Sequence, residues 1–216
     1  MTRKEIADRV QAWLGLQQID DYNELPLVQD MIYRGTIDLL ARTRCVARCV
    51  HLHTQANVDT YTLDHSILAL VDVDDGATRR AQRSDSLTSP SFALIRSDIL
   101  RVNPTPSVAG ELDVWAVLRP QKMQLDGDSP GDENYGAIPE EFQDAIELFC
   151  RWQCADYGDD ASSQIGERYR VLYEGPDGRG GKLQQIRMMV NKRGTSRAAS
   201  RRVRLSPVSD HDAWVG

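Results

Sequence analysis

The chain has 216 residues, of which 41% are hydrophobic and 27% are charged, and its 26 basic and 32 acidic residues give a net charge of −6. This composition is typical of a globular protein with a substantial core. The longest uninterrupted apolar run, residues 67–71, is far shorter than the roughly 18 residues that a membrane-spanning helix needs. The sequence therefore argues against a membrane protein. The first residues lack the apolar segment of a secretory signal, so we expect synthesis in the cytoplasm.

Charge is distributed unevenly along the chain. Residues 187–216 contain seven basic and two acidic residues, a balance of +5, which leaves −11 for residues 1–186. Within this acidic part, residues 126–160 hold eleven carboxylates and a single base, Arg151. A basic end and an acidic middle on one chain favour binding to nucleic acid, to an acidic protein, or to the opposite segment of an identical neighbour.

Residues 1–45 show the periodicity of two helices. Thr2 is a good N-cap, and Ile6 and Val10 begin an apolar series with the three- and four-residue spacing of a buried helix face. Pro26 lies near the start of the second helix, where its missing N–H costs least. We therefore assign residues 1–45 to the N-terminal helices of a bundle.

The period changes to that of strands between residues 46 and 120. Short apolar runs alternate with turn signals, among them the Asp-Asp-Gly sequence at residues 74–76, and residues 83–91 have the composition of a loop. The runs that we expect to form strands are residues 58–63, 67–73, 92–102 and 112–118. Residues 46–120 are therefore predicted to form an antiparallel β unit inserted between helices.

Helical periodicity returns in residues 121–194. An acidic loop extends to about residue 136, and Phe142, Ile146 and Phe149 then follow one face of a helix that starts after Pro139. Residues 195–216 offer little to pack, and we expect an arm that becomes ordered only on a partner. The predicted fold is α+β: a helical bundle with an inserted antiparallel β unit and an extended basic C-terminal arm.

Four residues in a short segment are candidate zinc ligands. Cys45, Cys49, His51 and His53 have suitable side chains, but their spacing matches none of the usual zinc motifs. If residues 50–53 form a strand, the two histidines share one of its faces. We favour packing thiols and a half-exposed histidine pair, which leaves no metal or other cofactor in the predicted function.

The remaining chemistry-bearing residues also have simpler explanations. Cys150 and Cys154 lie on an apolar helix and are expected to fill its core. No nucleophile elbow, phosphate-binding loop or dinucleotide fingerprint is present, so the sequence predicts a protein that is not an enzyme. The basic C-terminal segment has no aromatic residue among its arginines for stacking on bases, and docking on an acidic protein is equally compatible with it.

Several segments together resemble one family. The most telling pieces are Ala137–Phe142, with Ile-Pro-Glu-Glu-Phe opening a helix, the acidic break at Asp156–Asp160, the strand Leu112–Pro120 ahead of them, and the stretch from Gly181 to Gly194. In their order they resemble the head-to-tail adaptor, or neck, proteins of tailed bacteriophages. The resemblance covers most of the chain and rests on its overall pattern.

The resemblance implies a structural role in the virion neck. Adaptor proteins of this kind form a ring, usually of twelve copies, between the portal and the next tail-side protein, and DNA passes through without sequence-specific binding. It also implies that the C-terminal extension reaches the portal. A tail terminator or a head-completion protein is the alternative within this class, and a nucleic-acid-binding regulator that uses its C-terminal arginines is the alternative outside it.

We assign two candidate surfaces to this role. The first, called here the basic set, is expected to contact the portal or a neighbour and comprises Lys192, Arg193, Arg197, Arg201, Arg202 and Arg204. The second, called the acidic set, is expected to face a neighbouring subunit or the DNA passage and comprises Asp128, Asp132, Glu133, Glu140, Glu141 and Asp144.

Overall fold

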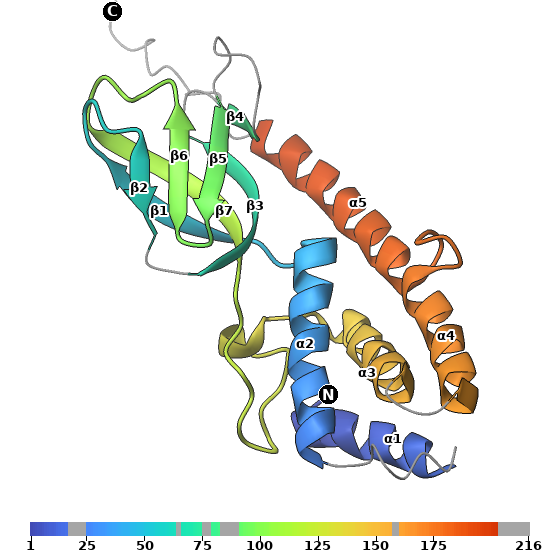
Figure 1. Ribbon diagram of the computed structural model, residues 1–216. Coiled ribbons are helices and arrows are strands. Elements are labelled where there is room, and N and C mark those ends of the chain that lie inside the picture. Colours follow the sequence, from blue (N-terminus) through green and yellow to red (C-terminus); the bar gives the residue numbers. More distant parts are fainter. Residues whose placement is uncertain (17–24, 64–65, 75–78, 83–90, 157–159, 203–216) are drawn as a thin grey trace, which may run out of the picture.

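The computed structural model describes residues 1–16, 25–63, 66–74, 79–82, 91–156 and 160–202. Its helices are α1 (Arg3–Leu16), α2 (Leu25–Thr43), α3 (Asp144–Asp156), α4 (Asp160–Glu174) and α5 (Lys182–Arg202). Its strands are β1 (Arg48–Thr54), β2 (Thr60–Thr62), β3 (Ile67–Asp74), β4 (Arg79–Gln82), β5 (Ser91–Arg96), β6 (Ile99–Asn103) and β7 (Gly110–Leu118). The strands lie at one end of the molecule and α1–α4 at the other, and α5 runs from the helices towards the strands (Figure 1).

The helices that precede and follow the strands share one hydrophobic core. Ile6 of α1, Ile32 of α2, Ile146 of α3, Tyr173 of α4 and Ile186 of α5 are all fully buried in it. The predicted cap of the first helix is confirmed, because Thr2 Oγ1 accepts a hydrogen bond from the Glu5 N–H at 3.2 Å while Glu5 accepts one from the Thr2 N–H. The helices before the strands, α1 and α2, therefore form a single bundle with the helices after them, α3, α4 and α5.

The seven strands form one sheet in the order β1-β7-β3-β4-β5-β6-β2. In Figure 1, β2, β5 and β6 lie in front of β1, β3 and β7. A second core fills the space between them, with Leu70 of β3, Phe92 of β5, Leu100 of β6 and Val114 of β7. All strand pairs are antiparallel except β4 with β5, whose short pairing is parallel. The α+β class is confirmed, whereas the division of the chain into separate units stays a prediction.

Sequence periodicity missed two strands and merged two others. β1 was considered only for residues 50–53, and β4 falls in a segment with no apolar run. The expected strand 92–102 is two strands, because a turn at Ser97 and Asp98 reverses the chain between β5 and β6. The residues on both sides of this turn are largely apolar, so the hydrophobic pattern of the sequence did not reveal the turn.

The expected start of an extended arm at residue 195 is wrong, because α5 continues to Arg202. Gly194 was expected to end the helix, but a glycine inside a helix costs only about 1 kcal/mol relative to alanine, and the flanking arginine and alanine residues are good helix formers. The part of the expected arm from residue 203 to residue 216 lies outside the described residues.

A glycine-rich turn sets the angle between α4 and α5. Gly175 has φ +96° and its N–H caps α4 by bonding the Val171 carbonyl at 2.8 Å. A Cβ added at Gly175 lies 1.8 Å from the Arg179 carbonyl oxygen, whereas one added at Gly178, with φ +69°, meets nothing within 4 Å. Gly175 is therefore required both for its conformation and for space.

We predict that Gly175→Ala lowers the free energy of unfolding by about 3 kcal/mol or more, because left-handed strain adds to a backbone collision. Gly178→Ala is the matched control, with the strain but without the collision, and loses about 1 kcal/mol. Urea denaturation of the two variants measures both values. Equal losses for the two variants would contradict the role of close backbone packing in this turn.

Candidate interaction surfaces

The start of α5 is anchored in the bundle, and its basic end lies beyond the anchor. Leu183 and Ile186 are buried, and the Arg187 guanidinium donates through Nε to the Arg42 carbonyl of α2 at 2.9 Å. Met188, Met189, Asn191 and Lys192 are exposed, whereas Val190 still packs against the core of the bundle. The anchored part thus fixes the direction in which the rest of α5 leaves the bundle (Figure 1).

Most of the basic set is carried by this helix. Arg193, Arg197 and Arg201 lie within α5 at four-residue intervals, which places their backbone positions on one side of the helix. Arg202 is its last residue, and Arg204 lies outside the described residues. The basic set is therefore borne mainly by a helix, where the sequence predicted an extended chain.

A polar network fixes α4, and through it the base of α5, to α2. Tyr173 is buried, and its hydroxyl donates to Asp38 Oδ2 at 2.7 Å. Burial, and next the charge of Asp38, raise the pKa of Tyr173 well above its ordinary value, so the hydroxyl stays a donor. Arg42 forms an ion pair with Glu174 and lies 3.6 Å from Asp38. The side chains of α2 and α4 are thereby held in one relative position.

Two members of the acidic set shape their own loop. Asp128 Oδ2 accepts hydrogen bonds from the N–H groups of Gln124 and Leu125, both at 2.8 Å, and Asp132 accepts one from the Ser129 N–H at 3.2 Å. The Leu125 hydrogen bond is the largest cause of a lowered pKa for Asp128. These carboxylates accept hydrogen bonds from backbone N–H groups of the loop between β7 and α3, where little regular structure is present to satisfy them. Part of their hydrogen-bonding capacity is therefore used within the loop.

The loop between β7 and α3 is also docked on α1. The Asp128 carbonyl accepts a hydrogen bond from the Arg3 N–H at 2.6 Å, and the buried Arg3 side chain reaches Asp126 Oδ1 at 2.5 Å. Arg3 is thus a buried cation paired with an exposed carboxylate. The loop is fixed to the helices at both of these points.

The other four members of the acidic set are exposed. Asp144, at the first turn of α3, forms an ion pair with Lys182 of α5 at 2.6 Å. Glu133, Glu140 and Glu141 also lie at the surface. These three glutamates lie on the outside of the segment between β7 and α3 and of the turn that leads into α3. 

A hollow of about 200 Å³ lies where the helices meet the sheet. It is lined by Leu40 at the end of α2, Arg48 of β1, Arg119 after β7, and Asn134 of the acidic loop. The Arg48 guanidinium donates to the Glu133 carbonyl at 2.5 Å across this junction. Sequence reasoning gave no sign of the hollow, because its walls come from segments far apart in the chain.

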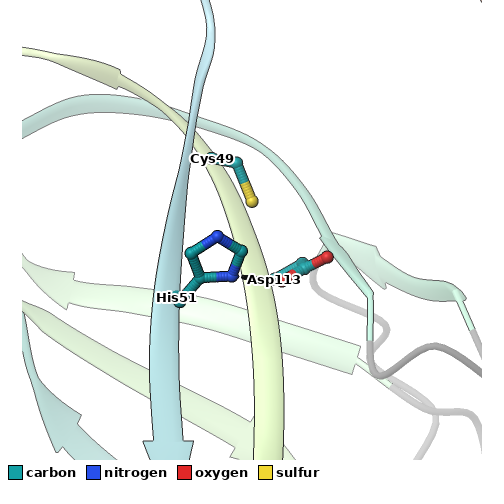
Figure 2. Close-up of side chains that lie close together, drawn as sticks. All are labelled: Cys49, His51 and Asp113. Atoms are coloured by element: carbon teal, nitrogen blue, oxygen red, sulfur yellow. Dashed lines mark hydrogen bonds and ion pairs between the residues drawn. The ribbon is translucent and has the colours of Figure 1, made fainter.

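The candidate zinc ligands are divided by the structure. Cys49 and His51 lie together on β1 and are joined by Asp113 of β7, so that one ligand atom of each is within 4.8 Å of the others (Figure 2). His53 instead lies 3.3 Å from Glu111, and Cys45 precedes the strand. The contribution of Asp113 was missed because it is 62 residues away from His51.

The other two cysteines fill the core, as predicted. Cys150 and Cys154 are fully buried in α3. Burial raises the pKa of the Cys150 thiol well above its ordinary value and that of Cys154 to about 11. Because the thiolate is the reactive form, these residues are unsuited to nucleophilic chemistry.

Comparison with protein-family models matches residues 1–205 to the family described as SU10 adaptor protein. The chain belongs to this family. Membership confirms the resemblance to phage head-to-tail adaptor proteins, which are structural proteins of the virion neck. A search of curated proteins found no significant match. Within the described residues, no helix combines the length and the apolar character that crossing a membrane requires.

The lowered pKa of Asp128 predicts a dependence of stability on pH. Because the folded state favours the charged carboxylate, its contribution is present above the pKa of the unfolded chain, near 3.8, and is lost as the pH falls through the lower folded value. We expect Asp128→Asn to lower the melting temperature at pH 7 and to make the melting temperature fall less steeply on acidification.

The exposed Glu140→Gln is the control for the removed charge, and we expect it to leave the acid dependence of the native protein nearly unchanged. Melting curves recorded between neutral pH and about pH 2.5 make the comparison. If Asp128→Asn melts with the same acid profile as the native chain, the loop does not depend on this carboxylate.

Proposed function

We propose that the chain is a subunit of a head-to-tail adaptor ring that joins the portal to the tail and encloses the DNA passage. The observation that carries the proposal is the match of residues 1–205 to the SU10 adaptor family. A ring of twelve copies agrees with the opposite charges of the chain, because each subunit of a closed ring offers one surface and receives a different one.

The basic set is the proposed contact with the portal. It lies beyond the anchored start of α5, so the bundle holds the base of the helix while the helix carries the basic positions away from this anchor. Complementary charge speeds association and selects the partner more than it adds affinity. We therefore expect an acidic receiving surface on the portal.

The contacts within the chain show which members of the acidic set already have a structural role. Asp128 and Asp132 hold the loop through backbone hydrogen bonds, and Asp144 pairs with Lys182. The proposed surface towards a neighbour or the passage therefore centres on the exposed Glu133, Glu140 and Glu141. Like charge in a passage limits adhesion of DNA, since its phosphates are repelled at short range. This agrees with DNA passing through without sequence-specific binding.

Charge reversal in α5 tests the portal contact. The triple variant Arg193→Glu, Arg197→Glu and Arg201→Glu is expected to weaken binding to purified portal rings about tenfold or more, and the native interaction is expected to weaken with salt. The matched control reverses three exposed charges elsewhere, Lys4→Glu, Arg34→Glu and Arg96→Glu. Biolayer interferometry measures binding, and circular dichroism checks that both variants fold.

Undiminished portal binding by the α5 variant would remove the basic set from the mechanism. Tight binding of the native protein to duplex DNA, with a steep salt dependence that the α5 variant flattens, would favour the nucleic-acid-binding regulator instead. Binding of the protein to the tail tube, without binding to the portal, would favour the alternative that it is a tail terminator.

A further inference from the structure

Three metal-ligating side chains meet on the outer face of the sheet. Cys49 and His51 are two residues apart on β1, so they point to the same side, and Asp113 is the direct partner of His51 on the antiparallel strand β7. Figure 2 shows the Cys49 sulfur and the His51 ring turned towards the same space beside Asp113. The sheet register alone therefore brings a thiol, an imidazole and a carboxylate together.

The imidazole orientation is already set. His51 Nδ1 lies 2.8 Å from Asp113 Oδ1, and one ligand atom of each of the three residues is within 4.8 Å of the others. Ligand atoms around a tetrahedral zinc ion are about 3.5 Å apart, because the metal–ligand bonds are about 2.0–2.3 Å long. Side-chain rotations that move the ligand atoms by about an ångström bring them to this spacing without any movement of the strands.

The backbone beneath the cluster is firmly held. β1 pairs with β7 from Arg48 to Thr54, and β7 pairs on its other side with β3. Ligands that stand on paired strands keep their relative positions better than ligands on loops. The cluster thus spans the edge strand β1 and its neighbour β7, and its side chains face solvent, with exposed fractions of 70% for His51 and 45% for Asp113.

Further carboxylates lie on the strands beside the cluster. Asp74 of β3 is the partner of Asp113 on the side away from β1, and Asp72 is two residues before it. Glu111 lies two residues before Asp113 on β7, next to His53. Asp74 is in turn the register partner of Arg79 on β4.

We propose that Cys49, His51 and Asp113 bind one zinc ion per chain. Thiolate and imidazole ligands select zinc and related transition metals over calcium and magnesium, which prefer oxygen ligands alone. Binding requires loss of the Cys49 thiol proton, which passes to solvent, and the fourth coordination position is filled by water. The proposal replaces the packing role that the sequence favoured for Cys49 and the half-exposed, metal-free histidine that it favoured for His51.

Such an ion links β1, the first strand along the chain, to β7, the last strand along the chain, which is its neighbour in the sheet. The ligands lie on β1 and β7, and the chain between them includes every other strand. Because the site is assembled only by this strand pairing, zinc binds the folded form in preference to the unfolded chain and stabilises it by mass action. The proposal does not depend on the adaptor role, since it concerns a single chain.

Zinc titration of the reduced, metal-free full chain tests the site. Isothermal calorimetry is expected to give about one zinc ion per chain, and a rise in melting temperature is expected on zinc addition. Substituting cobalt is expected to give the near-ultraviolet absorption of a thiolate–cobalt bond. Cys49→Ser is expected to abolish this absorption, and Asp113→Asn to weaken zinc binding at least about tenfold.

Cys45→Ser and His53→Asn are the matched controls, because they remove the same side-chain types outside the cluster, and both are expected to bind zinc like the native chain. The proposal is overturned if the native chain does not bind zinc, or if Cys49→Ser retains the thiolate–cobalt band. It is also overturned if zinc binding depends on Cys45 and His53 as strongly as on the three proposed ligands.

Discussion

The hydrogen bond from the buried Tyr173 to Asp38 joins residues 135 positions apart and links α4 to α2, on the two sides of the inserted strands. A buried hydroxyl without a partner costs about 1–3 kcal/mol, so this bond favours the observed relative position of α2 and α4. Arg42 adds an ion pair to Glu174, and its carbonyl accepts the hydrogen bond of Arg187 from α5. The direction of α5, and of the charges it carries, therefore depends on this contact.

Charge in this protein is used in two ways. Carboxylates such as Asp128 satisfy backbone N–H groups where the chain between β7 and α3 has little regular structure. The basic residues of α5 beyond its anchor are instead the contact that we propose with the portal. A count of charges along the sequence does not distinguish carboxylates that hold a loop from charges that are available to a partner. The hydrogen bonds in the structure identify the first kind.

The sequence predicted those elements whose pattern is local. The cap at Thr2, the apolar face of α1 and the helix after Pro139 depend on neighbouring residues and were recognised. β1 was largely missed because its outward positions are cysteine and histidine, which suggested metal chemistry more than a strand. The ligand cluster could not be predicted because Asp113 joins it through sheet register, and the length of α5 was underestimated because Gly194 has the signature of a helix end.

The chain belongs to the SU10 adaptor family, and we propose that it assembles into a closed ring on the portal. Electron microscopy of the purified protein, alone and mixed with portal rings from the same phage, tests it most directly. The account predicts closed rings of twelve copies seated coaxially on the portal, with α5 at the contact. A monomer that leaves the portal bare at high protein concentration would contradict it.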